Sequence, residues 1–77
     1  MNKTQKHLVE LITRDVICFI SQDCNLSVDS ALETFFISDV FDKLQDIETG
    51  LYTESASYIY EIFKNEHSAF YSKHGYE

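Results

Sequence analysis

Three histidines and two cysteines are the side chains of this chain that could bind a transition metal. His67 and His74 are seven residues apart, which is two helical turns and too far along the axis for both to ligate one ion unaided. Cys18 and Cys24 are six residues apart, so a continuous helix through both would place them on different faces. We therefore predict two thiols rather than a disulfide, histidines on helix surfaces, and no metal or other cofactor.

Asp46 and Glu48 precede Gly50 in a pattern that partly matches a calcium loop. An EF-hand loop counted from Asp46 needs glycine at its sixth position and glutamate at its twelfth, where this chain has Leu51 and Ser57. No closely spaced glycines could hold a phosphate, and no base is identifiable beside Cys18. The sequence therefore predicts a chain that is not an enzyme and takes no small-molecule substrate.

Acidic residues are concentrated in the middle of the chain, whose net charge is −7. Residues 1–38 carry three cations and five carboxylates, whereas residues 39–66 carry two cations and seven carboxylates. A field of this sign repels a phosphate backbone and attracts basic protein surfaces. We therefore expect a basic protein partner and no direct nucleic-acid binding; acidic charge that only keeps the chain soluble is the alternative.

Three of these carboxylates, Asp39, Asp42 and Asp46, are spaced to form one ridge on a short helix. Like charges at this spacing destabilise a helix, and only Asp39 is offset by a predicted helix N-terminus. Tyrosine next to such acid is typical of protein interfaces, and Tyr60 is about 100° from the apolar stripe of its helix. The predicted partner-binding residues are Asp39, Asp42, Asp46, Glu48, Glu54, Tyr52 and Tyr60. The alternatives are a solvated acidic face and tyrosines half-buried at the edge of the core.

Helices must position these residues, because the chain has no proline and only two glycines. Apolar residues recur at helical spacing and predict an all-α bundle of four helices, at about 3–22, 28–37, 39–45 and 56–71, with 72–77 a frayed tail. The first stripe is Leu8, Leu11, Ile12, Val16, Phe19 and Ile20, and the second is Val28, Ala31, Leu32, Phe35 and Phe36. Residues 58–62 also alternate, but no second strand is available to pair with them.

The ends of these helices carry local signals. Ser27, Ser38 and Ser55 are predicted N-caps, each with a hydroxyl that can accept a backbone N–H of the first turn, and Thr53 is the alternative to Ser55. Asn25 and Gly50 are predicted to adopt left-handed backbone conformations after the first and third helices. Leu51 and Tyr52 should then pack back onto the core.

The chain is predicted to be one cytoplasmic domain, 1–77. It shows no signal-peptide pattern and no apolar run near the roughly 18 residues of a membrane span. A domain of this length buries only about 60% of its unfolded surface. Part of its apolar area could therefore belong to a dimer seam or a partner site.

The middle of the chain resembles a group of short bacterial proteins of unknown function, found in Gram-positive bacteria and their mobile elements. The resemblance runs through residues 25–66, with Thr49-Gly50-Leu51-Tyr52 as its distinctive stretch. Members of a similar-looking group are encoded beside toxin-like genes, some resembling ADP-ribosyltransferases. The resemblance thus implies an antitoxin-like or accessory role and supplies no catalytic residues.

The sequence favours a non-enzymatic protein–protein interaction module that binds through its acidic and aromatic surface. One alternative is a homodimeric structural protein whose partner is itself. Another is a helix-turn-helix regulator built from 28–37 and 39–45, joined at Ile37 and Ser38. The would-be recognition helix carries Asp39, Asp42 and Asp46 against Lys43, which argues against this last reading.

Overall fold

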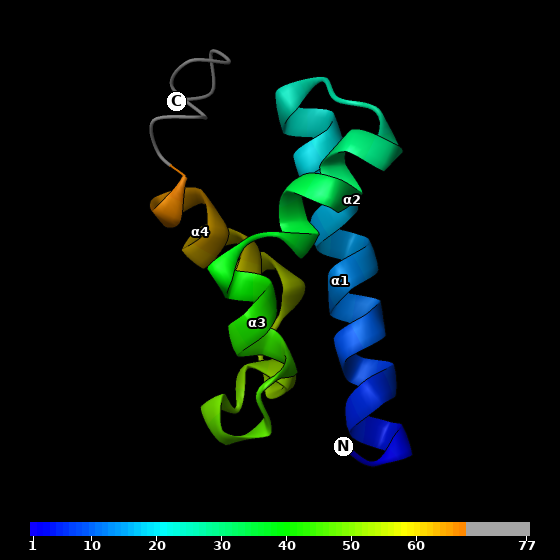
Figure 1. The fold of residues 1–77 in the computed structure, drawn as a ribbon, viewed down its shortest axis with the longest axis vertical. Coiled ribbons are helices and arrows are strands. Elements are labelled where there is room, and N and C mark those ends of the chain that lie inside the picture. Colours follow the sequence, from blue (N-terminus) through cyan, green and yellow to red (C-terminus); the bar gives the residue numbers. More distant parts are fainter. Residues whose placement is uncertain (68–77) are drawn as a thin grey trace.

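A computed structural model describes residues 1–67 and shows an all-α bundle, as predicted (Figure 1). Its elements are α1 (Lys3–Cys24), α2 (Val28–Phe36), α3 (Asp39–Gln45), η1 (Ile47–Thr49), η2 (Leu51–Thr53) and α4 (Ala56–Glu66), where η denotes a 3₁₀ turn. No strand occurs within residues 1–67, so residues 58–62 are helical. Residues 68–71, expected in the fourth helix, and the expected frayed tail lie outside the described residues.

Side-chain hydrogen bonds fix where each helix begins. The hydroxyls of Ser27, Ser38 and Ser55 accept the backbone N–H groups of residues 30, 41 and 58, which confirms the three predicted N-caps. α1 begins with a capping box between Asn2 and Gln5, which the sequence analysis did not identify. Local chemistry therefore sets the four helix starts.

Left-handed residues end α1 and turn the chain after α3. Asn25 has φ 55°, and its N–H bonds to the Ser21 carbonyl, so α1 runs two residues beyond the predicted end at residue 22. Gly50 has φ 70° between the two 3₁₀ turns, as predicted. These turns bring α4 back against α1, and Leu51 and Tyr52 pack on the core as expected.

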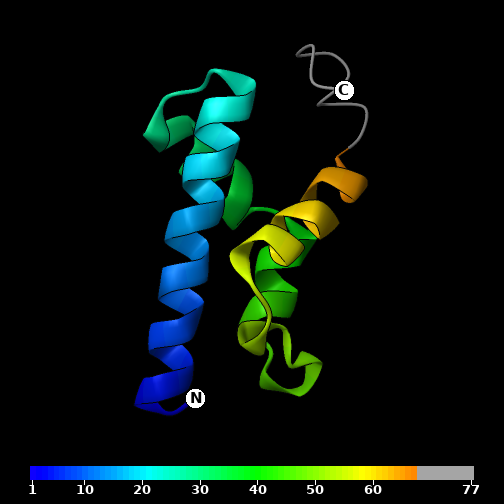
Figure 2. The ribbon, with the colours of Figure 1, turned by 180° about the vertical axis from the view of Figure 1, so that it is seen from behind.

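The core lies where α1, α2, α3 and α4 meet. In Figures 1 and 2, α1 forms a long rod on one side, α2 folds back along its C-terminal half, and α3 and α4 pack side by side across from it. The largest fully buried side chains come from all four helices: Phe35, Phe63, Ile20, Leu44, Ile59, Val16 and Val40. The rings of Phe35 and Phe63 are 5.7 Å apart edge to face, which joins α2 to α4.

The buried face of α1 is rotated from the predicted stripe. Leu8 and Leu11 are only half-buried, whereas Val9, Ile17 and Cys24, which the stripe left out, are buried. The reason is that α2 packs on one side of α1 while α4 and η2 pack on another. The apolar residues between these two contacts enter the core.

The stripe of α2 is also buried less than predicted. Ala31 and Phe35 are buried, but Val28 is 58% exposed and Phe36 is 43% exposed. α2 crosses α1 and α3 with one edge of its stripe turned outward. Val28 and Phe36 lie on this outward edge.

Candidate interaction surfaces

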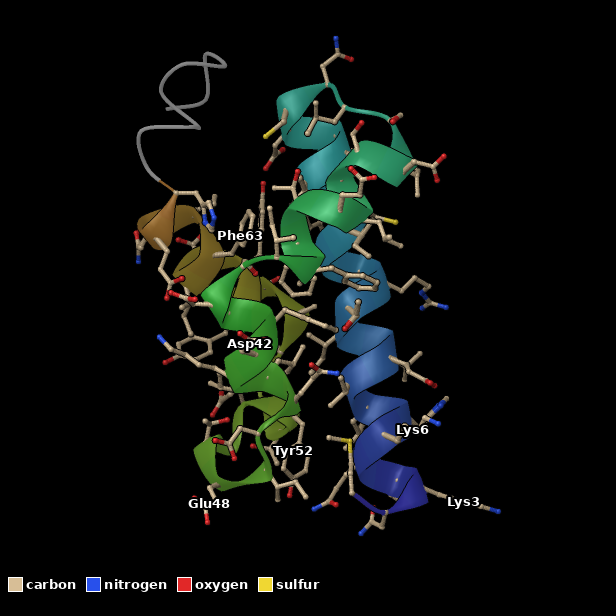
Figure 3. All side chains as sticks on the ribbon, viewed as in Figure 1. Lys3, Lys6, Asp42, Glu48, Tyr52 and Phe63 are labelled. Carbon is tan, nitrogen blue, oxygen red and sulfur yellow. The ribbon has the colours of Figure 1, made fainter. Side chains whose placement is uncertain are left out.

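The predicted acidic ridge lies on the surface of α3 and η1. We call Asp39, Asp42, Asp46 and Glu48, all exposed, the acidic face. In Figure 3, Asp42 lies on α3 and Glu48 lies below it, in the link that follows α3. Glu54 is exposed directly after η2.

Backbone groups of α3 and η1 offset part of this negative charge. Asp42 lies with Asp39 in the first turn of α3, so the helix dipole stabilises both carboxylates, whereas we expected it to stabilise only Asp39. The Asp46 carboxylate accepts the N–H of Glu48 at 3.0 Å and caps η1. Local helix chemistry thus accounts for the position of three of the four acidic residues.

No residue of the acidic face forms an ion pair with a cation among residues 1–67. Lys43, the cation of α3, instead pairs with Glu66 of α4 at 3.2 Å. The carboxylates of the acidic face are therefore exposed to solvent and form no ion pair with a described residue.

Tyr60 is not the exposed partner-binding residue that we expected. It is 6% exposed, and its hydroxyl donates to the Asp23 carboxylate at 2.6 Å. Its ring lies 5.3 Å from that of Phe19. α4 packs against α1 over a wide face, so the position next to Ile59 falls inside the helix interface rather than outside it. The exposed tyrosine of this helix is Tyr58, at 50%.

The distinctive Thr49–Tyr52 stretch has a structural role in the link from α3 to α4. The Thr49 hydroxyl donates to the Lys43 and Asp46 carbonyls and accepts the N–H of Leu51. Tyr52, a predicted partner-binding residue, is half-buried and accepts a hydrogen bond from Gln5 Nε2 at 3.1 Å. This stretch ties the link to the start of α1.

An apolar groove, which the sequence analysis missed, runs between α1, α2 and α3. Its volume is about 550 Å³, and α4 contributes none of its lining residues. The rings of Phe36 and Phe41 stack 4.7 Å apart within it, beside Leu32 and Ile17. In Figure 1, α2 and α3 lie in front and α1 passes behind α2, whereas Figure 2 shows α1 and α4 in front.

The α1 wall of the groove carries cations. It presents Lys6, Glu10 and Arg14 at four-residue steps, which is one face of the helix. Lys3 and Lys6 project outward from α1 in Figure 3. This wall therefore has two cations and one carboxylate.

Acidic residues border the groove on the α2 and α3 side. Asp29, Glu33, Asp42 and Asp46, all exposed, each follow a groove-lining residue by one position, after Val28, Leu32, Phe41 and Gln45 respectively. One position is about 100° around a helix, so these carboxylates stand just outside the apolar lining. The two sides of the groove thus carry opposite charge.

α1 brings a hydroxyl and a thiol to the groove lining, from Thr13 and Cys18. Thr13, in the groove lining, has a buried hydroxyl without a hydrogen-bond partner in the described part of the chain. Cys18 is exposed in the same lining, while Cys24 is buried, so the two thiols lie on different faces of α1 as predicted. Residues 1–67 contain no group of three metal-ligating side chains, and no helix there is long and apolar enough to span a membrane.

The histidines were expected on helix surfaces. His7 is exposed, but His67 is half-buried: its ring stacks on Phe63 at 4.2 Å, and its Nδ1 lies 2.9 Å from the Phe63 carbonyl. His74 lies outside the described residues.

No protein-family model, curated protein or solved structure matches this chain.

Proposed function

We propose that this chain is a non-enzymatic protein-interaction module that binds a helix of another chain in the groove between α1, α2 and α3. The observation that carries the proposal is the exposure of Val28 and Phe36 beside this groove. Apolar area left in water costs about 25 cal/mol per Å², which burial against a partner recovers. An apolar groove bordered by charged side chains can bind the apolar face of an amphipathic helix.

The resemblance in residues 25–66 supports the same class of function. An antitoxin-like or accessory protein acts by binding another protein, and such an activity needs no catalytic residues. The proposal includes a cytoplasmic location, in keeping with two thiols that form no disulfide with each other.

Co-purification with a groove variant tests the proposal. Phe36→Asp places a charge in the groove, and Ile37→Asp is the matched control, because Ile37 is 85% exposed and is not among the groove-lining residues. We expect the tagged wild-type and Ile37→Asp chains to retain the same bound chain, whether another protein or an untagged copy, and Phe36→Asp to lose it. Equal capture by all three chains would mean that the groove is not the binding surface.

The acidic face supports a second proposal, in which it steers a basic partner toward the molecule. Its four exposed carboxylates form no ion pair among residues 1–67, and fields of this kind mainly raise association rates. Neutralising Asp42, Asp46 and Glu48 as Asn or Gln should slow association and flatten its dependence on ionic strength. The control makes the same charge change at Asp15, Glu61 and Glu66; if both variants slow association equally, only net charge matters.

A further inference from the structure

We propose that the groove packs against the groove of a second copy of this chain in a two-fold symmetric dimer. This inference rests on the proposed function, because it names the chain that the groove binds. The symmetry axis would run along the groove, so that α1 of each copy lies over α2 and α3 of its partner.

The charges on the two sides of the groove favour this arrangement. The α1 wall presents Lys6 and Arg14 with one carboxylate, and the opposite side presents Asp29, Glu33 and Asp42. Rotation by half a turn about the groove axis exchanges the two sides. Each cationic wall then faces an acidic side, and the contact is made twice, as symmetry requires.

The cations of α1 can take new partners at little cost. Arg14 pairs with Asp15 at 3.5 Å, but the two side chains are 70% and 48% exposed, and exposed pairs of this kind contribute little. Lys6 is exposed and forms no ion pair with a described residue. Pairing across a dimer would therefore replace weak surface contacts.

The same rotation turns the apolar lining of one groove toward that of the other, and so shields Val28 and Phe36 of both copies from water. The net charge of −7 opposes the meeting of two copies. However, the groove lining carries two cations and one carboxylate, so the lining itself has a net charge of +1. Asp39 lies farther around α3 from the groove-lining residues Phe41 and Gln45 than Asp42 does.

Two charge-reversal variants test this arrangement when they are mixed. Lys6→Glu with Arg14→Glu makes both sides of the groove acidic, and Asp29→Lys with Glu33→Lys makes both sides basic. All four positions are exposed, so each variant should fold, which circular dichroism can check. Each variant alone should raise the dimer dissociation constant by about tenfold or more, measured by sedimentation equilibrium. An equimolar mixture should recover dimers of nearly wild-type affinity, because each acidic α1 then faces a basic α2.

A control variant separates the groove from overall charge. Glu61→Lys with Glu66→Lys makes the same charge change as the basic variant on α4, which contributes none of the groove lining, and should leave the dimer intact. A wild-type chain that is monomeric at every concentration, or a mixture that forms no dimer, would overturn the inference.

The co-purification test then decides how far the failure extends. Suppose that the wild-type chain is monomeric but captures a different protein, and that the Phe36→Asp variant does not capture it. The dimer is then wrong and the proposed function stands. If Phe36→Asp changes nothing either, both proposals fail.

Discussion

The interface between α1 and α4 contains a partly buried polar contact. The Tyr60 hydroxyl donates to the exposed residue Asp23, and the Tyr60 ring packs among apolar neighbours, including Phe19 and Phe63. Lys64 lies 4.9 Å above the same ring. A hydrogen bond to a charged acceptor contributes more than one between neutral groups. One phenol thus helps fix how α4 sits on α1.

Removing this hydroxyl should destabilise the fold without changing its shape. Tyr60→Phe keeps the ring and its stacking, and we expect it to lower the free energy of unfolding by about 1.5–3 kcal/mol, the range for hydrogen bonds to charged groups. Urea denaturation followed by circular dichroism measures the change. Tyr58→Phe is the control, because Tyr58 is half exposed, and it should change stability by less than about 0.5 kcal/mol. Equal effects at both positions would contradict the assigned role of the Asp23 contact.

Residue-scale prediction succeeded where the signal was local and failed where it depended on neighbouring helices. The three serine caps follow from a hydroxyl and the N–H groups of the next turn, so sequence is sufficient. Whether Tyr60 is buried depends on the width of the contact between α1 and α4. Its angle of about 100° from Ile59 fits either outcome. Sequence alone therefore could not distinguish a partner-binding tyrosine from a buried one.

The link from α3 to α4 depends on one left-handed residue. Gly50 has φ 70°, and a Cβ added there would meet nothing within 4 Å. The cost of a side chain at this position is thus conformational rather than steric. Thr49 and Tyr52 on either side hold the link through their hydroxyl groups.

Substitution of Gly50 should separate backbone strain from crowding. Gly50→Ala should lower the free energy of unfolding by about 1 kcal/mol, because L-residues other than Asn and Asp are disfavoured at positive φ. Gly50→Asn should cost less, since asparagine tolerates the left-handed region. Thermal unfolding of the two variants measures the difference. If Ala and Asn cost the same, the left-handed conformation is not what requires glycine here.

The boundaries of the elements were predicted better than their orientations. Helix 39–45 was predicted with the bounds it has in the structure, and α2 ends one residue before its predicted end. The buried face of α1 differs from the predicted stripe. Helical periodicity defines a wide apolar stripe but does not show which edge of the stripe a neighbouring helix covers. Val9 and Ile17 are buried because α1 is covered by α2 on one side and by α4 and η2 on another.

At the scale of the whole molecule, the groove arises from how α2 crosses α1 and α3. Val28 and Phe36 fit the predicted core stripe of α2, so nothing in their spacing marks them as surface residues. Their exposure follows from the orientation of α2, which buries Ala31 and Phe35 instead. The acidic face could be predicted from sequence because exposed charge is the default for Asp and Glu. An apolar groove between three helices could not.

Adjacent phenylalanines on α2 should therefore have different functions, one in folding and one in binding. Phe35 is fully buried between α3 and α4, whereas Phe36 is 43% exposed in the groove lining. Phe35→Ala should cost about 3–5 kcal/mol, a large part of the roughly 4–12 kcal/mol expected for a domain of this length. Phe36→Ala should cost less, because part of its ring is already in water, and should mainly weaken association. Urea denaturation at low concentration and sedimentation equilibrium measure the two effects separately. If Phe36→Ala destabilised the monomer as much as Phe35→Ala, the ring would belong to the core, and the groove would lose its main apolar residue.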